Sequence, residues 1–140
     1  MATRVPYREF REKDGTKLYW ILFNVQLAQL KPGSPQTRNA ECVIDSGATN
    51  CLFDSTLADA LGIELKSGVR QRMTGIGGQE EIWLHDVMLH IPGGPVQITA
   101  CFKERLGIGG LLGLNGFFEH FVITFDPALK VCTLDRIHKA

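Results

Sequence analysis

The feature that most constrains the fold is the segment from Cys42 to Thr49, which reads Cys-Val-Ile-Asp-Ser-Gly-Ala-Thr. An apolar run leads directly into Asp45, and the Ser-Gly pair after it is typical of a buried strand that breaks into a tight turn. The pattern therefore places the Asp45 carboxylate at the end of a core strand. A carboxylate in such a place is costly unless it is hydrogen-bonded, paired or used in chemistry. The simpler alternative is an N-cap or Asx-turn role for Asp45, and this segment alone does not decide between the two.

The length and the charge balance limit the classes of protein that fit. A chain of 140 residues is the size of one domain with a usable core. Its 15 acidic and 15 basic residues cancel and are scattered, which argues against a nucleic-acid or anionic membrane surface as the main partner. No apolar stretch is long enough to span a bilayer, and the first residues do not resemble a secretory signal. We therefore expect a soluble, cytoplasmic protein without nucleic-acid or membrane partners.

The four cysteines, at positions 42, 51, 101 and 132, form no Cys-x-x-Cys pair. Several of them stand in apolar runs, which predicts buried free thiols in a reducing compartment. Two disulfides remain the alternative at this point.

The hydrophobic pattern predicts many short strands and two short helices. Residues 1–15 are polar and charged, and we expect residues 1–17 to form an N-terminal extension to a domain that spans residues 18–140. A short helix is expected after Asp54 or Ser55, ending at Gly62, and a second one near residues 117–121. The expected strands are Leu18–Leu30, 40–45, Val69–Met73, Glu81–Leu89, Val96–Phe102, Val122–Phe125 and Lys130–Leu134. Two of these flank Gly75–Gly78, so they should form a hairpin with a glycine tip.

Other kinds of site find little support in the sequence. Neither glycine-rich loop, at Gly75–Gly78 or Gly107–Gly113, completes a phosphate-binding motif. The histidines are not spaced as metal ligands, and no histidine stands near a cysteine as a local nucleophile pair. We therefore expect no metal and no cofactor.

Three motifs remain, in the order Asp45-Ser46-Gly47, the hairpin with the tip Gly75–Gly78, and Leu111-Leu112-Gly113. In this order the chain resembles a retropepsin-like aspartic protease, over roughly Leu18 to Leu134. The resemblance implies an all-β, single-lobe fold, closed like a β-barrel, with a flap hairpin, one or two short helices and a two-fold dimer.

The resemblance also implies a role for each matching residue. Asp45 would be the catalytic aspartate, Ser46 the hydroxyl that locks two active-site turns together, and Gly47 a contact for the substrate backbone. Ala48 and Thr49 would line subsites, and Gly75, Ile76, Gly77 and Gly78 would form the flap tip over the substrate. Leu111, Leu112 and Gly113 would support the catalytic loop. The chain departs from retroviral members at Thr49 and Leu114, where an acid and an arginine commonly pair; losing both is less costly than leaving one buried charge.

The chemistry needs two carboxylates, and the chain has one such motif. A homodimer supplies the second, so we expect an aspartic endopeptidase that acts on polypeptide substrates through a shared acid pair and an activated water. One alternative is a catalytically silent member of this fold that serves as a dimerisation or peptide-binding module. A small-molecule-binding β-barrel is another, and it would tolerate Asp45→Ala.

Overall fold

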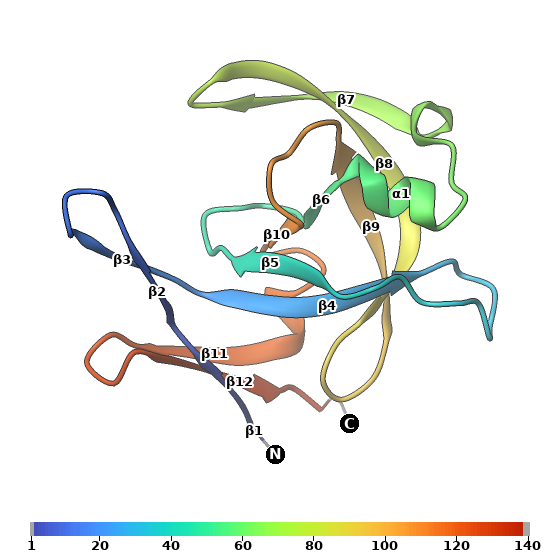
Figure 1. Ribbon diagram of the computed structural model, residues 1–140. Coiled ribbons are helices and arrows are strands. Elements are labelled where there is room, and N and C mark those ends of the chain that lie inside the picture. Colours follow the sequence, from blue (N-terminus) through green and yellow to red (C-terminus); the bar gives the residue numbers. More distant parts are fainter. Residues whose placement is uncertain (1, 139–140) are drawn as a thin grey trace.

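The computed structural model describes residues 2–138, and most of them lie in strands (Figure 1). In chain order the elements are β1 (Ala2–Pro6), β2 (Arg8–Arg11), β3 (Lys17–Trp20), β4 (Leu22–Ala28), β5 (Ala40–Ile44), β6 (Leu52–Asp54), α1 (Ser55–Ala60), η1 (Leu65–Ser67), β7 (Val69–Gly75), β8 (Gly78–His90), β9 (Val96–Lys103), β10 (Gly110–Leu112), η2 (Phe118–His120), β11 (Phe121–Asp126) and β12 (Val131–Arg136). Here η marks a single turn of 3₁₀-helix. The expected all-β class is confirmed.

The main sheet has the strand order β4-β5-β10-β6-β9-β8-β7. A further pairing of β4 with β8 joins its two sides, so that six of the strands form a barrel-like ring. Strand β7 lies outside this ring and pairs with β8 as a long hairpin that reaches its tip at Gly75–Gly78. This hairpin occupies the position that the resemblance assigns to a flap, so it is called the flap below; it extends over the top of the ring in Figure 1. The expected hairpin is therefore confirmed.

The core of the ring is filled by large side chains that the sequence pattern turns inward. Strand β4 alternates between buried and less buried positions at its C-terminal half, as a half-buried strand should. The largest side chains that are fully buried include Phe53, Phe102, Phe117, Leu89 and Leu112. All four cysteines are free and buried, which confirms the predicted buried thiols.

A second sheet, of order β1-β12-β11, lies below the ring in Figure 1. Residues 2–6 pair with β12 along their whole length and bury Val5. The pattern did not predict this strand, because a strand with one buried residue carries almost no hydrophobic signal. The division into an extension at 1–17 and a domain at 18–140 stays a prediction, with β1 hydrogen-bonded to the last strand.

Two other expectations need correction. The predicted strand Leu18–Leu30 is two strands: β3 pairs with β2 in a separate hairpin, and β4 enters the ring after Ile21. The break falls where the Ile21 carbonyl turns to accept a hydrogen bond from the Ile44 backbone N–H. The second predicted helix is only the 3₁₀ turn η2, whereas the first, α1, is confirmed with Asp54 as its N-cap.

Within residues 2–138, no helix has the length and apolar character that crossing a membrane requires.

Candidate active site

Asp45 directly follows β5, at the end of a strand whose side chains at Ala40, Cys42 and Ile44 are buried. Its backbone N–H donates to the carbonyl of Leu112 at 3.0 Å, so the neighbouring strand β10 fixes the point at which β5 ends. The side chain is half-buried. The carboxylate thus lies where the pattern placed it, between a core strand and an open surface.

The turn after Asp45 is held by the aspartate itself. The Gly47 backbone N–H donates to Asp45 Oδ1 at 2.8 Å, and the Ala48 N–H donates to the Asp45 carbonyl at 3.2 Å. A β-carbon at position 47 would lie 3.2 Å from the same Oδ1, which explains a glycine there. The arrangement is an Asx-turn, as the simpler alternative required, but it uses one carboxylate oxygen and leaves the other without a partner among residues 2–138.

Strand β10 passes between β5 and β6, parallel to the first and antiparallel to the second. The passage is tight. A β-carbon at Gly113 would lie 2.5 Å from the Asn50 carbonyl oxygen and 2.6 Å from that of Ala48. One at Gly110 would lie 2.6 Å from the Leu52 carbonyl oxygen. Only residues without a side chain allow the backbone of β10 to approach both flanks of the turn this closely.

The chain beyond β10 holds the far side of the turn. The Leu114 N–H donates to the Ala48 carbonyl at 2.9 Å, and the Asn115 N–H donates to the Thr49 carbonyl at 2.8 Å. Backbone bonds therefore join the segment of Ala48 and Thr49 to the segment of Leu114 and Asn115. The side chains of Thr49 and Leu114 are both exposed.

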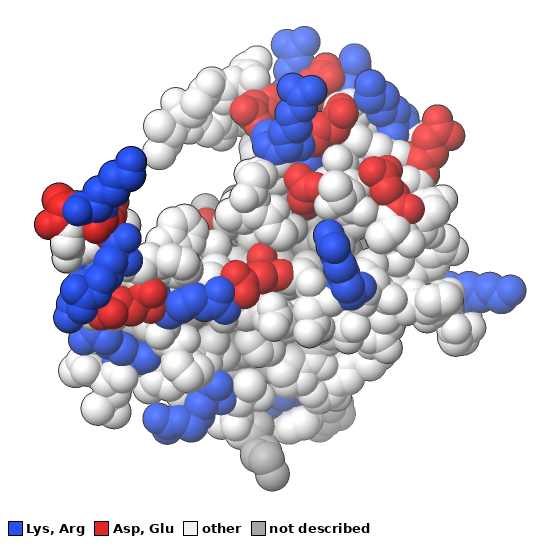
Figure 2. Space-filling model, viewed as in Figure 1, with Lys and Arg blue, Asp and Glu red and all other residues white. Residues whose placement is uncertain are grey.

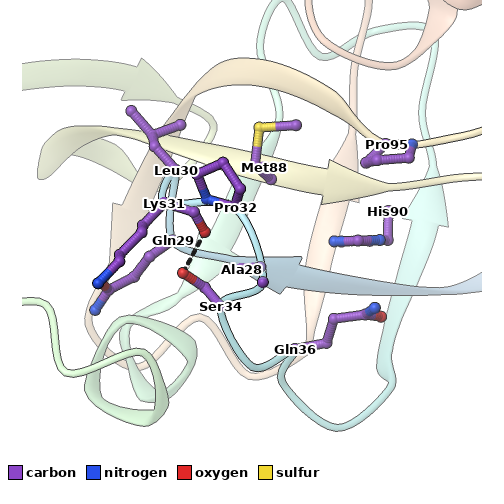
Figure 3. Close-up of a pocket in the computed structure, with 11 residues that line it drawn as sticks. Ala28, Gln29, Leu30, Lys31, Pro32, Ser34, Gln36, Met88, His90 and Pro95 are labelled. Carbon is purple, nitrogen blue, oxygen red and sulfur yellow. Dashed lines mark hydrogen bonds between the residues drawn. The ribbon is translucent and has the colours of Figure 1, made fainter.

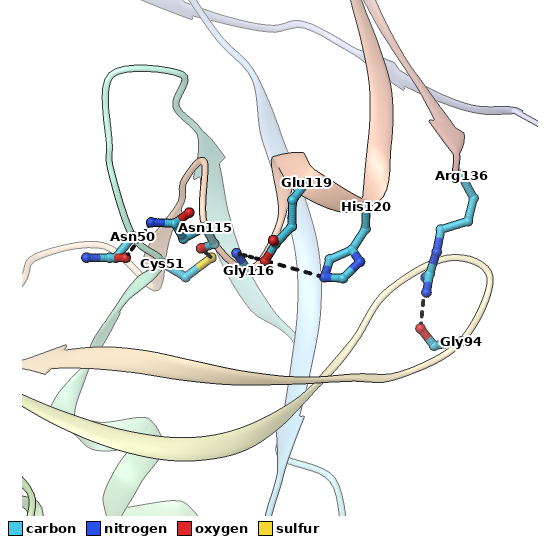
Figure 4. Close-up of polar contacts among 8 residues, drawn as sticks. All are labelled: Asn50, Cys51, Gly94, Asn115, Gly116, Glu119, His120 and Arg136. Carbon is cyan, nitrogen blue, oxygen red and sulfur yellow. Dashed lines mark hydrogen bonds and ion pairs between the residues drawn. The ribbon is translucent and has the colours of Figure 1, made fainter. Parts of the chain in front are cut away.

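An amide pair that the sequence reasoning missed lies one residue further along each segment. The Asn115 side chain donates from Nδ2 to Asn50 Oδ1 at 3.2 Å, and the Cys51 thiol donates to the Asn115 carbonyl at 3.5 Å (Figure 4). The neighbouring Gly116 N–H donates to Glu119 Oε1 at 2.7 Å. This neutral amide pair thus links the same two segments. Its only signal in the sequence is that an asparagine follows both Thr49 and Leu114.

A second aspartate, Asp54, has a different fate. Its Oδ2 caps α1 by accepting from the Thr56 N–H at 3.0 Å, and its Oδ1 accepts from the Leu106 N–H at 2.9 Å. Burial by itself raises the pKa of Asp54, but the Thr56 hydroxyl, which donates to Oδ2 at 2.7 Å, together with these backbone hydrogen bonds and the nearby Lys103 charge, outweighs it and holds the pKa below its ordinary value. Both oxygens of Asp54 are occupied in maintaining the fold.

The flap tip is exposed, and Ile76 projects fully into solvent. Beneath it lies a cavity of about 280 Å³, with apolar walls from Leu52, Met73, Leu106 and Leu111. Three flap glycines, Gly75, Gly77 and Gly78, line the same cavity. An ion pair of 2.7 Å between Lys103 Nζ and Glu80 Oε2 lies at its edge and joins the flap to the end of β9. The structure thus brings Leu111 and the flap glycines together, and it places Asp45 beside Leu112 in the adjacent turn.

A larger cavity, of about 490 Å³, lies elsewhere, beside the loop between β4 and β5 (Figure 3). Its lining includes Leu30, Met88 and His90 but no acidic residue and no cysteine. Cavity size alone therefore does not identify a candidate active site in this molecule.

Metal and thiol chemistry gain no support from the geometry. Residues 2–138 contain no group of three or more histidine, cysteine or acidic side chains placed to hold a metal. Burial raises the pKa of Cys42 to about 12 and that of Cys51 to about 11, so these thiols near the turn stay protonated at neutral pH.

The sequence profile of a family described as aspartyl protease matches residues 33–115, which is more than half of the chain. No curated protein matches the sequence. Among solved structures, a retropepsin-like aspartic protease from Rickettsia conorii is similar, with a TM-score of 0.63 at 16% identity over 96% of this chain and 98% of that one.

Two further structures share the fold. The EIAV protease complexed with the inhibitor HBY-793 matches with a TM-score of 0.50 at 14% identity, over 67% of this chain and 81% of that one. The retroviral protease-like domain of Ddi1 from Leishmania major matches with a TM-score of 0.50 at 16% identity, over 84% and 94%. At these identities the likeness establishes the retropepsin-like fold.

Proposed function

The chain belongs to the aspartyl protease family, and from this membership we propose that it is an endopeptidase whose acid pair consists of Asp45 from two copies of the chain. The observation that carries the proposal is the position of Asp45. It is a half-buried carboxylate at the end of a core strand, in a glycine turn that β10 fixes from one side. The family and the fold support aspartic peptidase activity in general. That the acid pair is shared by two subunits is the specific part of this proposal.

The need for a second copy follows from the surroundings of Asp45. Within residues 2–138 its side chain interacts with the Gly47 backbone N–H, and no other carboxylate is paired with it. Ser46 is exposed beside it, and its hydroxyl has no partner in this part of the chain. A two-fold axis beside the turn would bring two Asp45 carboxylates together, with Ser46 locking the turns. Two such groups share one proton and titrate as a unit.

The reaction then needs nothing beyond this pair and water. The ionised Asp45 takes a proton from a water molecule, whose oxygen forms a bond to the peptide carbonyl carbon. The protonated Asp45 of the other copy gives its proton to the carbonyl oxygen as negative charge develops there. When the tetrahedral gem-diol collapses, the amine nitrogen takes a proton from the pair and the C–N bond breaks, while one hydroxyl of the intermediate returns its proton to the pair. The carboxyl product forms, and the pair again holds one shared proton.

The remaining predicted residues position the substrate in this proposal. Gly47, Ala48 and Thr49 line the cleft beside the pair, while Gly75, Ile76, Gly77 and Gly78 close over an extended polypeptide. Leu111, Leu112 and Gly113 hold the turn in place. The apolar walls of the cavity under the flap favour apolar side chains near the cleaved bond. The free thiols are consistent with a reducing, cytoplasmic location.

The decisive experiment mixes wild-type chain with Asp45→Asn at a fixed total concentration, under conditions in which subunits exchange. The amide keeps an oxygen for the Gly47 N–H but cannot act as a base, so pure Asp45→Asn should lose about a thousandfold or more in turnover. A shared site predicts that the rate falls with the square of the wild-type fraction. Initial rates on an unfolded protein such as casein, measured across acidic to neutral pH, give the curve.

Circular dichroism and sedimentation control for equal folding and dimerisation of the two proteins. A rate linear in the wild-type fraction would mean that each chain carries a complete site and would refute the shared pair. Substantial turnover by folded Asp45→Asn would remove Asp45 from the chemistry, and absence of turnover by wild type would favour a silent module.

A further inference from the structure

The hairpin formed by β2 and β3, residues 8–20 and called the arm below, projects from the ring (Figure 1). All eight of its strand residues are exposed. Isolated two-stranded hairpins are marginally stable in water, so the arm needs support from elsewhere. At its base the Arg8 guanidinium donates two hydrogen bonds to the Glu41 carboxylate, at 2.8 and 2.7 Å, and Lys130 Nζ lies 5.1 Å from the centre of the Tyr19 ring.

One face of the arm is complete in itself. Glu9, Arg11, Lys17 and Tyr19 share this face by the period of two along each strand. Tyr19 donates its hydroxyl to Glu9 at 3.2 Å, and Glu9 also forms ion pairs with Lys17 at 3.7 Å and Arg11 at 3.8 Å. In Figure 2 the charged side chains of the arm stand out at the left of the molecule. This face is suited to water.

The opposite face carries Arg8 at the base of the arm and is otherwise apolar and only partly covered. The register places Phe10 opposite Leu18, and Trp20 follows on the same side two residues later. These three side chains are 42%, 40% and 43% exposed, respectively. A cavity of about 440 Å³ separates Phe10 and Trp20 from the loop Gly107–Gly109. Large apolar side chains clustered on one exposed face are typical of an interaction surface.

The position of the arm indicates which partner covers it. In Figure 1 the arm, the flap tip and the end of β5, which Asp45 follows, all lie on the left side of the molecule. Asp45 is incomplete as an acid pair in one chain, so a second copy that completes it has to approach this same side. The approaching copy then meets the arm.

We propose that the arm packs the face formed by Phe10, Leu18 and Trp20 against a second copy of this chain, as a dimerisation arm. The inference rests on the proposed function, because the shared acid pair is what brings the second copy to this side. In the dimer the arm contributes binding energy outside the catalytic turns, and side chains of the second copy fill the cavity of about 440 Å³.

The test compares large apolar side chains of similar exposure at two places. Leu18→Ser and Trp20→Ser alter the arm, whereas Leu30→Ser alters the loop between β4 and β5, where Leu30 is 43% exposed. Sedimentation equilibrium should give a dimer Kd that rises about tenfold or more for each arm variant. The Leu30→Ser value should stay within about twofold of wild type, since surface changes away from an interface have small effects. Circular dichroism at high concentration, where all chains are dimeric, checks folding.

The outcomes separate the arm from the proposed function. Unchanged Kd in both arm variants, together with a quadratic mixing curve, would overturn the arm and leave the shared acid pair standing. Wild-type chains that stay monomeric while cleaving peptides would overturn both. An unchanged Kd with a raised KM for peptide would mean that the apolar face binds substrate, and this too would overturn the dimerisation arm. If Leu30→Ser raised the dimer Kd as much as the arm variants do, the effect would come from lost apolar surface in general, and the dimerisation arm would be wrong.

Discussion

A β-carbon added at Gly113, beside the turn that carries Asp45, would lie 2.5 Å from a backbone oxygen, whereas one added at Gly77 in the flap tip meets no atom within 4 Å. Both glycines belong to motifs that identified the fold. At Gly113 the missing side chain lets three chain segments come together. At Gly77 the space is empty, and the missing side chain leaves the backbone unrestricted.

Glycine therefore serves two opposite purposes in this chain: close backbone packing at Gly113, and an unrestricted backbone at Gly77. The turn forms backbone hydrogen bonds with Leu112, Leu114 and Asn115, and these bonds fix its geometry. The flap tip is exposed on all sides and has few buried contacts, the features of segments that open locally at low cost. In the function proposed above, the fixed turn would position the Asp45 carboxylate, and the mobile flap tip would admit a polypeptide chain.

The largest effect on folding should come from filling the crowded position. Gly113→Ala forces the β-carbon against the carbonyl oxygens of Asn50 and Ala48, so we expect the free energy of unfolding to fall by about 3 kcal/mol. Urea unfolding at a fixed protein concentration measures the change. The matched variant Gly77→Ala should alter the same free energy by less than about 1 kcal/mol. If the two variants unfold at the same urea concentration, the contrast between turn and flap is wrong.

A smaller effect, on activity rather than stability, is expected at the flap. Gly77→Val has room for its side chain but restricts the backbone and crowds a bound peptide, so kcat/KM should fall about tenfold. The free energy of unfolding should change by no more than about 1 kcal/mol. Gly77→Ala serves as the milder member of the series. Normal cleavage by Gly77→Val would show that Gly75–Gly78 is only a turn.

The smallest expected effect concerns the amide pair behind the turn. Asn115→Ala removes an exposed hydrogen bond to Asn50, which should lower the free energy of unfolding by about 0.5 kcal/mol. A double-mutant cycle with Asn50→Ala isolates the pair. Thr49→Ala, at an exposed neighbour without a side-chain partner in the described residues, controls for simple truncation. A coupling energy near zero would mean that the backbone bonds alone hold the two segments together.

Signals within short segments of the sequence made several elements of the fold predictable. Asp54 at the start of α1 and the glycines between β7 and β8 each determine structure within a few residues, and the structure agrees with both. The three motifs in order identified the family because each stands in a short segment. The catalytic and substrate-binding roles of those segments stay predictions.

Non-local pairing could not be predicted. Asn50 and Asn115 are 65 residues apart, and neither stands in a pattern that points to the other. Lys103 and Glu80 likewise meet only because β9 pairs with β8. Residues 2–6 form a strand through their partner β12 rather than through their own hydrophobicity. In each case the missing information was which distant segment lies alongside.

The insertion of β10 between β5 and β6 also sets an order of events during synthesis. Asp45 is synthesised before Leu112, whose carbonyl accepts from the Asp45 N–H, and before Leu114 and Asn115, which supply the bonds behind the turn. A nascent chain that ends before these residues lacks the strand that fixes the turn. Closing so long a loop is slow compared with forming the flap hairpin or α1. The Asp45 carboxylate is therefore held in position only after residues 112–115 have been made and have reached the turn, so a growing chain that ends before them carries this turn without its supporting strand.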